Sequence, residues 1–217
     1  MPSLRVIGVY TLTAAVLSVA VILSCQANEQ TRRFPFELEI LAANAHALLS
    51  PTLARQHKQA LKTRIASSLG TLRILAREYI QAKHLSKTDL LNRIDALQDV
   101  FKSKKWQYFA TTSRKLANQY PAVLNGLLPA DAKPKDISSG RRIYQHLCIG
   151  CHENTDMSQA SPALNLFDIA KTQPQPEFIA RLVCGVHGTP AVALHNPFSD
   201  AEIAGLTAYL LKGKQPH

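Results

Sequence analysis

The stretch Cys148-Ile149-Gly150-Cys151-His152 decides how the C-terminal part of this chain is interpreted. Two cysteines separated by two residues are typical of a disulfide, of a redox-active pair or of half a zinc site. A structural zinc site requires two more ligands at similar spacing, and the sequence contains no second pair of that kind. A redox-active pair is typical of a βαβ unit, which this sequence does not predict.

The histidine that directly follows the second cysteine favours another interpretation. C-x-x-C-H is the attachment signature of c-type haem. At the end of a short helix, this spacing lets Cys148 and Cys151 reach the two vinyl groups on one edge of the same porphyrin. His152 then projects its imidazole under the iron as the proximal ligand. The sequence therefore predicts one covalently bound haem c.

A glycine and an aromatic residue precede the motif at fixed distances. Gly140 stands eight residues before Cys148, and Tyr144 stands four residues before it. This arrangement resembles the first helix of the class I monohaem c-type cytochromes, and the resemblance covers about residues 138–213. It implies that Gly140 packs closely against an aromatic residue of the last helix. Tyr209 is placed for that role and for contact with the haem.

A proline follows the motif in the segment Ser161-Pro162-Ala163-Leu164. The resemblance implies that the carbonyl of Pro162 accepts the imidazole N–H of His152. A contact of this kind orients a ligating imidazole and raises its basicity. Pro162 is therefore expected to support the proximal side of the haem.

The sixth iron ligand is the main departure from the family. The resemblance implies a Met just before a proline, upstream of the last helix, but Thr189 stands there, and a neutral hydroxyl is a poor iron ligand. His187 is our first candidate for the distal ligand, and His195 is a weaker one. An open iron, Met157, Cys184 or a group from the N-terminal part are the alternatives. Two histidine ligands would give a low potential, whereas an open iron would admit peroxide or small gases.

The N-terminus predicts an export segment. Residues 6–23 are apolar or small and follow a single charge at Arg5. The stretch Ile22-Leu23-Ser24-Cys25 resembles the lipobox of bacterial lipoproteins, which implies that Cys25 is lipidated. An uncleaved membrane anchor and simple secretion are the alternatives. All three place the rest of the chain outside the cytoplasm, and we expect a membrane-anchored protein of the bacterial periplasm.

Residues 34–128 predict helices, because apolar side chains recur every three or four positions. Four amphipathic helices with short connections most simply form an antiparallel bundle, with one apolar face each. Farther along, Ser138 and Ser139 are placed to cap a helix that begins at Gly140. Ser199 and Glu202 form the pattern of a capping box at the start of the last helix.

The expected fold class is therefore all-α, with an N-terminal antiparallel bundle before a small class I cytochrome c domain. The predicted divisions are a signal peptide of lipoprotein type, a basic helical bundle, a linker and the cytochrome c domain, at residues 1–24, 30–128, 129–137 and 138–217.

The formal net charge of +10 lies almost entirely in the first half of the chain. Residues 28–135 contain eighteen Lys and Arg against eight Asp and Glu, whereas residues 136–217 contain six against seven. A basic bundle can attract anionic lipid headgroups or an acidic redox partner. Nucleic acid is excluded as a partner by the predicted location.

The sequence shows no catalytic triad, no paired acid/base carboxylates and no phosphate-binding loop. We therefore predict an electron carrier rather than an enzyme, with donor and acceptor proteins as partners. One alternative is a haem protein with an open iron that binds peroxide or gases. The other is a haem-bearing accessory subunit of a larger redox complex.

Overall fold

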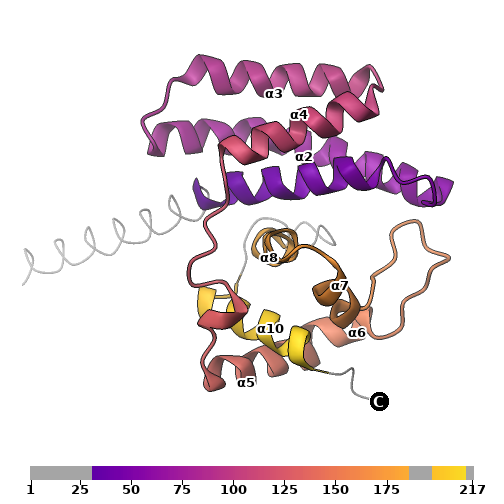
Figure 1. Cartoon of the computed structure of the whole chain (residues 1–217), viewed down its shortest axis with the longest axis vertical. Coiled ribbons are helices and arrows are strands. Elements are labelled where there is room, and N and C mark those ends of the chain that lie inside the picture. The colour runs from indigo at the N-terminus through magenta and orange to yellow at the C-terminus, as the bar shows by residue number, and fades with distance from the viewer. Residues whose placement is uncertain (1–30, 186–196, 214–217) are drawn as a thin grey trace, which may run out of the picture.

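The computed structural model describes residues 31–185 and 197–213 (Figure 1). Every regular element within them is helical, which confirms the all-α prediction. The predicted signal peptide and Cys25 lie outside the described residues. None of the described helices combines the length and the apolar character needed to cross a membrane.

Four helices build the N-terminal bundle, and consecutive helices run in opposite directions (Figure 1). They are the first helix (31–47), α2 (Arg55–Ala82), α3 (Lys87–Lys102) and α4 (Trp106–Gln119). Side chains from all four form one buried core: Phe34, Leu38, Leu41, Ile65, Leu69, Leu72, Ile80, Leu90, Ile94, Leu97, Phe109 and Leu116. The structure therefore contains the antiparallel bundle that the periodicity predicts.

The C-terminal part consists of shorter helices around a second and a third apolar cluster. In chain order they are the 3-10 turn η1 (Pro129–Asp131), α5 (Pro134–Ile143), the π-helical turn η2 (Tyr144–Cys148), α6 (Ile149–His152), α7 (Leu166–Thr172), α8 (Gln175–Cys184) and α10 (Asp200–Lys212). The last helix begins as predicted. The Ser199 hydroxyl accepts from the backbone N–H of Glu202 at 3.4 Å, and the Glu202 carboxylate accepts from that of Ser199 at 2.8 Å.

The helix before the haem motif begins earlier than expected. We predicted a start at Gly140, but α5 begins at Pro134, inside the segment expected to be a linker. Proline at the first helical position suits a helix start, because its missing N–H would have no partner there. The carboxylate of Asp136 accepts from the backbone N–H of Lys133 at 3.0 Å. Pro134 and Asp136, and not Ser138 or Ser139, therefore define the N-terminus of α5.

Helices α5 and α10 cross at two glycines. A Cβ atom added to Gly140 would overlap the backbone of Gly205 and Leu206. A Cβ atom added to Gly205 would overlap the backbone of Asp136. Only glycine allows two helix backbones to approach this closely, so the pair fixes where the two helices meet.

The first helix differs from the expected amphipathic pattern, because it is buried on two faces. Phe34 and Leu38 pack in the bundle core. Phe36 and Ile40 instead pack against Ile179 of α8 and apolar neighbours from the C-terminal part. A helix in contact with two cores is apolar nearly all round, so the prediction of one polar face was wrong here. Figure 1 shows this helix lying between the other bundle helices and the C-terminal part.

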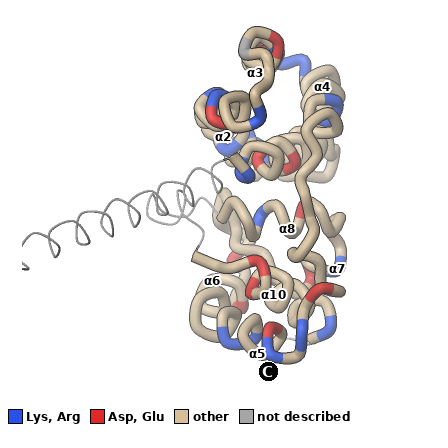
Figure 2. The backbone as a smooth tube through the Cα atoms, turned by 90° about the vertical axis from the view of Figure 1, so that its left-hand side faces the viewer, with Lys and Arg blue, Asp and Glu red and all other residues tan. Residues whose placement is uncertain are grey.

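Polar contacts reinforce this junction. Arg32 pairs with Asp200 at the start of α10, at 2.5 Å. Arg181 of α8 donates to the side-chain oxygen of Asn44 at 2.9 Å. The positions of Lys and Arg along the backbone, blue in Figure 2, lie in both the bundle and α5. The two parts of the chain are therefore joined by an extensive interface as well as by a connecting segment.

Candidate functional site

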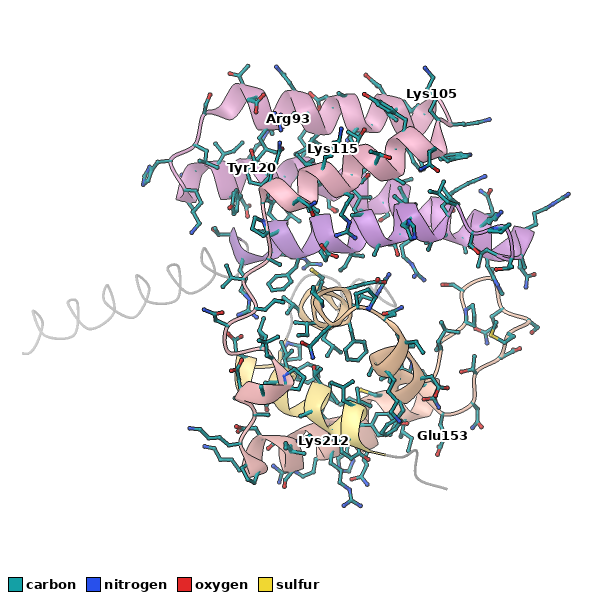
Figure 3. All side chains as sticks on the ribbon, viewed as in Figure 1. Arg93, Lys105, Lys115, Tyr120, Glu153 and Lys212 are labelled. Atoms are coloured by element: carbon teal, nitrogen blue, oxygen red, sulfur yellow. The ribbon has the colours of Figure 1, made fainter. Side chains whose placement is uncertain are left out.

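The C-x-x-C-H motif lies on a continuous helical stretch. Cys148 ends the π-helical turn η2, and Cys151 and His152 lie on α6. A π turn inside a helix is frequent at functional sites, because it redirects the side chains that follow. Cys151 is exposed, whereas Cys148 is half-buried and packs against the third apolar cluster. Glu153, labelled in Figure 3, follows His152 and marks this end of the domain.

His152 is held in one tautomer. Its Nδ1 lies 2.6 Å from the backbone carbonyl oxygen of Leu164. Because a carbonyl can only accept, Nδ1 carries the proton, and Nε2 keeps the lone pair that a metal requires. A hydrogen bond of this kind orients a ligating imidazole and strengthens it as a ligand.

The hydrogen-bond acceptor differs from the one expected. We predicted the carbonyl of Pro162, but the partner of His152 is Leu164. The residues on either side of Leu164 are both anchored. Thr155 donates to the carbonyl of Ala163 at 2.8 Å, and Asn165 caps α7. These two anchors present the Leu164 carbonyl to the imidazole, whereas a haem contact of Pro162 stays a prediction.

Replacing Asn165 with alanine is expected to lower the free energy of unfolding by about 1 kcal/mol. The side-chain oxygen of Asn165 accepts from the backbone N–H groups of Phe167 at 2.9 Å and Asp168 at 3.3 Å. Alanine leaves both groups without this partner. Chemical denaturation followed by circular dichroism measures the change. Asn165→Asp retains a capping oxygen and should stay close to wild type, and an equal loss in both variants would contradict the capping role.

The atoms of α10 nearest to Gly140 are backbone atoms of Gly205 and Leu206, and not ring atoms of the expected partner Tyr209. Gly140 packs against the α10 backbone at Gly205, as described above. Tyr209 lies one turn after the crossing point, where it meets the rings of Tyr144 and Phe167 at centroid distances of 5.9 and 5.6 Å. Residues four apart share a helix face. Tyr144 follows Gly140 by four residues and Tyr209 follows Gly205 by four, so the crossing of the glycines brings the two tyrosines together one turn later.

An apolar cluster lies beside the motif. Tyr144, Phe167 and Phe178 are buried in it, and Cys148 and Ile149 pack at its edge. Burial, followed by the charges of Glu153 and neighbouring groups, raises the pKa of Tyr144. Its hydroxyl is buried without a hydrogen-bond partner. The cluster therefore supports the segment of the motif that carries Cys148.

Three large apolar side chains just before the motif or in the loop that follows it are exposed. Leu147 is 66 % exposed, Met157 is 55 % exposed and Leu164 is 41 % exposed. Leu147 directly precedes Cys148, and Leu164 offers its carbonyl to His152, so both lie next to groups that would hold a haem. Together with the two thiols and the oriented imidazole, they fit a covalently attached haem.

The cysteines differ in environment. Burial and the neighbouring Cys151 raise the pKa of Cys148 to about 11. Cys184 is 2 % exposed and packs in the apolar cluster between α8 and the first helix. Burial, and then the carboxylate of Glu37, raise the pKa of its thiol well above the ordinary value. Cys184 therefore stays a neutral, packed side chain.

Of the residues considered for the distal ligand, His187 and His195 lie outside the described residues, as does Thr189. Met157 lies in the loop that follows His152, only five residues after this proposed proximal ligand. Cys184 is enclosed by packing.

Residues 135–210 match the family model described as cytochrome c oxidase, cbb3-type, subunit III. The C-terminal part of the chain is therefore a c-type cytochrome domain, which is an electron-transfer module that binds haem c. In particular, it is similar to the cytochrome domain of that oxidase subunit. The match includes Cys148, Cys151 and His152 and leaves the N-terminal bundle unmatched. No curated protein and no solved structure matches the chain.

Proposed function

We propose that this chain is a membrane-tethered, extracytoplasmic cytochrome that transfers single electrons through one haem, bound covalently to Cys148 and Cys151. The hydrogen bond between His152 Nδ1 and the Leu164 carbonyl carries the proposal, because it leaves Nε2 for the iron on the same short helical stretch as the exposed Cys151 and the half-buried Cys148. When bound, the haem accepts and releases one electron at its iron. The residues of the chain attach it, orient its proximal ligand and cover its apolar face.

The N-terminal sequence supports a tether close to the haem domain. The apolar segment 6–23 and the lipobox-like stretch ending at Cys25 suit a lipid anchor. The first helix is described from residue 31, and it packs directly against the cytochrome domain. Six residues span at most about 20 Å when fully extended. The cytochrome domain would therefore be held near the membrane surface, within reach of membrane-bound redox partners.

The basic bundle suits this arrangement. Its excess of Lys and Arg would favour anionic lipid headgroups or an acidic partner protein. We therefore propose donor and acceptor proteins at the membrane as the partners, with distal ligation by His187 in the electron-transfer form.

Loss of covalent haem tests the proposal. The full chain, produced with its export segment in a bacterium that matures c-type cytochromes, should contain one haem that stays bound under denaturing conditions. Cys148→Ser combined with Cys151→Ser should contain none, because both thioether bonds are lost. Cys184→Ala is the matched control and should keep the haem, since its thiol is buried in a packed cluster. Covalent haem in the double variant, or none in the wild type, would refute the attachment.

The visible spectrum of the same preparation separates electron transfer from ligand binding. An electron carrier with His187 as ligand should be low-spin in both redox states and unchanged by CO. His187→Ala should then become high-spin. A wild type that is high-spin and binds CO at once would instead establish an open iron, and the function would be peroxide or gas chemistry.

A further inference from the structure

The loop between α6 and α7, residues 153–165, lies against the second helix of the bundle. The side-chain nitrogen of Gln56 donates to the backbone carbonyl of Ser158 at 3.4 Å, and His57 Nε2 lies 3.2 Å from the backbone carbonyl oxygen of Gln159. Because a carbonyl can only accept, the ring of His57 is the donor in this contact. In Figure 1 the loop extends from the cytochrome domain towards the bundle. The first turn of α2 therefore binds two consecutive carbonyls of the loop.

A third contact lies farther along the same helix. Arg64 Nη2 donates to the hydroxyl of Ser161 at 2.5 Å. Arg64 follows His57 by seven residues, which is about two helical turns, so the two side chains lie on the same face of α2. The partners in the three contacts are 97 or 102 residues apart in the sequence, so the contacts come from the packing of the bundle against the loop and not from a local turn.

Hydrogen bonds within the loop hold its tip and its base together. At the tip, the carboxylate of Asp156 accepts from the backbone N–H and the hydroxyl of Ser158, at 2.9 and 2.6 Å. These hydrogen bonds lower the pKa of Asp156, so the carboxylate stays charged and keeps both donors near neutral pH. At the base, Thr155 donates to the carbonyl of Ala163 at 2.8 Å. A displacement of the tip from α2 would therefore also displace the base of the loop.

The base of the loop carries the hydrogen-bond acceptor of the proximal ligand. The Leu164 carbonyl oxygen lies 2.6 Å from His152 Nδ1. Ser161, which binds Arg64, precedes Leu164 by only three residues, and Pro162 between them has a restricted φ angle. The contacts with α2 are thus connected to the imidazole through a short and constrained segment.

We propose that Gln56, His57 and Arg64 of α2 are positioning residues for the proximal ligand, because they hold the loop in place and thereby keep the Leu164 carbonyl on the imidazole of His152. The effect on the haem rests on the attachment proposed above. A hydrogen bond at Nδ1 makes the imidazole a better electron donor to the iron, which stabilises the oxidised state and lowers the reduction potential. The bundle lies outside residues 135–210, so it would help to set the potential of a cofactor in the neighbouring domain.

The test combines Gln56→Ala, His57→Ala and Ser161→Ala in the haem-loaded full chain and leaves Arg64 in place. The reduction potential should rise, because a weaker hydrogen bond makes the imidazole of His152 a poorer donor. Exchange of the His152 Nδ1 proton with solvent, measured by NMR, should become several-fold faster. The loss of any positive charge on His57 would lower the potential instead, since a cation near the haem favours the reduced, less positive state. A change in charge therefore cannot produce the expected rise.

Two matched variants separate the loop contacts from a general effect of substitution. Gln59→Ala changes an exposed side chain on the same helix and should keep the wild-type potential and exchange rate. Ser161→Thr retains a hydroxyl for Arg64 and should do the same. An unchanged or lowered potential in the triple variant would overturn the proposal, and so would an equal rise in Gln59→Ala. Circular dichroism controls for folding. If the triple variant does not fold, Ser161→Ala alone should show a smaller rise, and no rise there would overturn the proposal.

The outcome for the haem and the outcome for the loop can be told apart. A wild type without covalent haem would refute the proposed function. The ring 15N chemical shifts of His152 would then test the contacts in the haem-free chain, where the wild type should show one tautomer, protonated at Nδ1, and the triple variant a mixture. The same shifts in both proteins would refute the contacts as well. A haem-loaded protein whose potential and proton exchange are insensitive to the triple substitution would refute this inference alone.

Discussion

Replacing Gly205 with alanine is expected to lower the free energy of unfolding by about 3 kcal/mol or more. The new methyl group would overlap the backbone oxygen and carbon of Asp136. Backbone atoms of a helix cannot rotate away as a side chain can, so α5 and α10 would have to separate. Their separation would disrupt the packing of Tyr144 against Tyr209 and loosen the helix that leads into the haem motif.

A matched control exists in the bundle. Gly70 lies in the middle of α2, and a Cβ atom added there would meet no heavy atom within 4 Å. Gly70→Ala should therefore stabilise the protein by up to about 1 kcal/mol, because alanine favours a helix interior. Denaturation by guanidinium, followed by circular dichroism, compares the two variants. If Gly205→Ala proved as stable as Gly70→Ala, the close crossing of α5 and α10 would be incorrect.

Replacing Arg33 with methionine is expected to cost about 3–5 kcal/mol of stability, because it leaves a buried carboxylate without its partner. The side chain of Glu37 is only 2 % exposed, and Arg33 Nη2 lies 3.1 Å from its Oε1. The same nitrogen donates to the backbone carbonyl of Cys184 at 3.1 Å. Methionine has similar length but no charge, so it removes both interactions at the junction of the first helix and α8.

Two further variants test whether the loss of stability in Arg33→Met comes from the unpaired, buried carboxylate of Glu37. Replacing both Arg33 and Glu37 with methionine should recover much of the stability, since no unpaired charge is then buried. Lys102→Met removes an exposed partner of Asp99, where both side chains are more than two-thirds exposed, and should change stability little. A small effect of Arg33→Met, equal to that of Lys102→Met, would contradict the buried pair.

Local sequence signals predicted much of the fold. The capping pattern at Ser199 and Glu202 correctly gave the start of α10, because both hydrogen bonds form within four residues. The first helix was misread for the opposite reason. Its apolar residues alternate as well as recurring every three or four positions, and Phe36 and Ile40 lie off the main stripe. That excess indicated a second buried face, but the partner of that face lies more than 130 residues away, in α8.

The functional site shows the same division. The C-x-x-C-H motif is local, and the family match over residues 135–210 confirms the cytochrome domain that it predicted. The predicted hydrogen-bond acceptor for His152, the carbonyl of Pro162, was two residues before the observed one, the carbonyl of Leu164. The position of that carbonyl depends on the path of the loop, which the hydrogen bonds of Thr155 and Asn165 fix. The contact of Asn44 with Arg181 of α8 carries no sequence signal, because it depends on how two helical groups that are distant in the sequence pack together.

The two-faced first helix also limits how this protein can be divided. A segment cut at the boundary of the family match would lack Phe36 and Ile40, and the apolar surface of Ile179 and Ile203 would face solvent. Such a fragment would be prone to aggregate. The bundle would in turn lose the cover over one side of its first helix. Recombination that exchanges this cytochrome module for another would therefore need to carry the first helix with it, so the two parts are expected to be inherited as one unit.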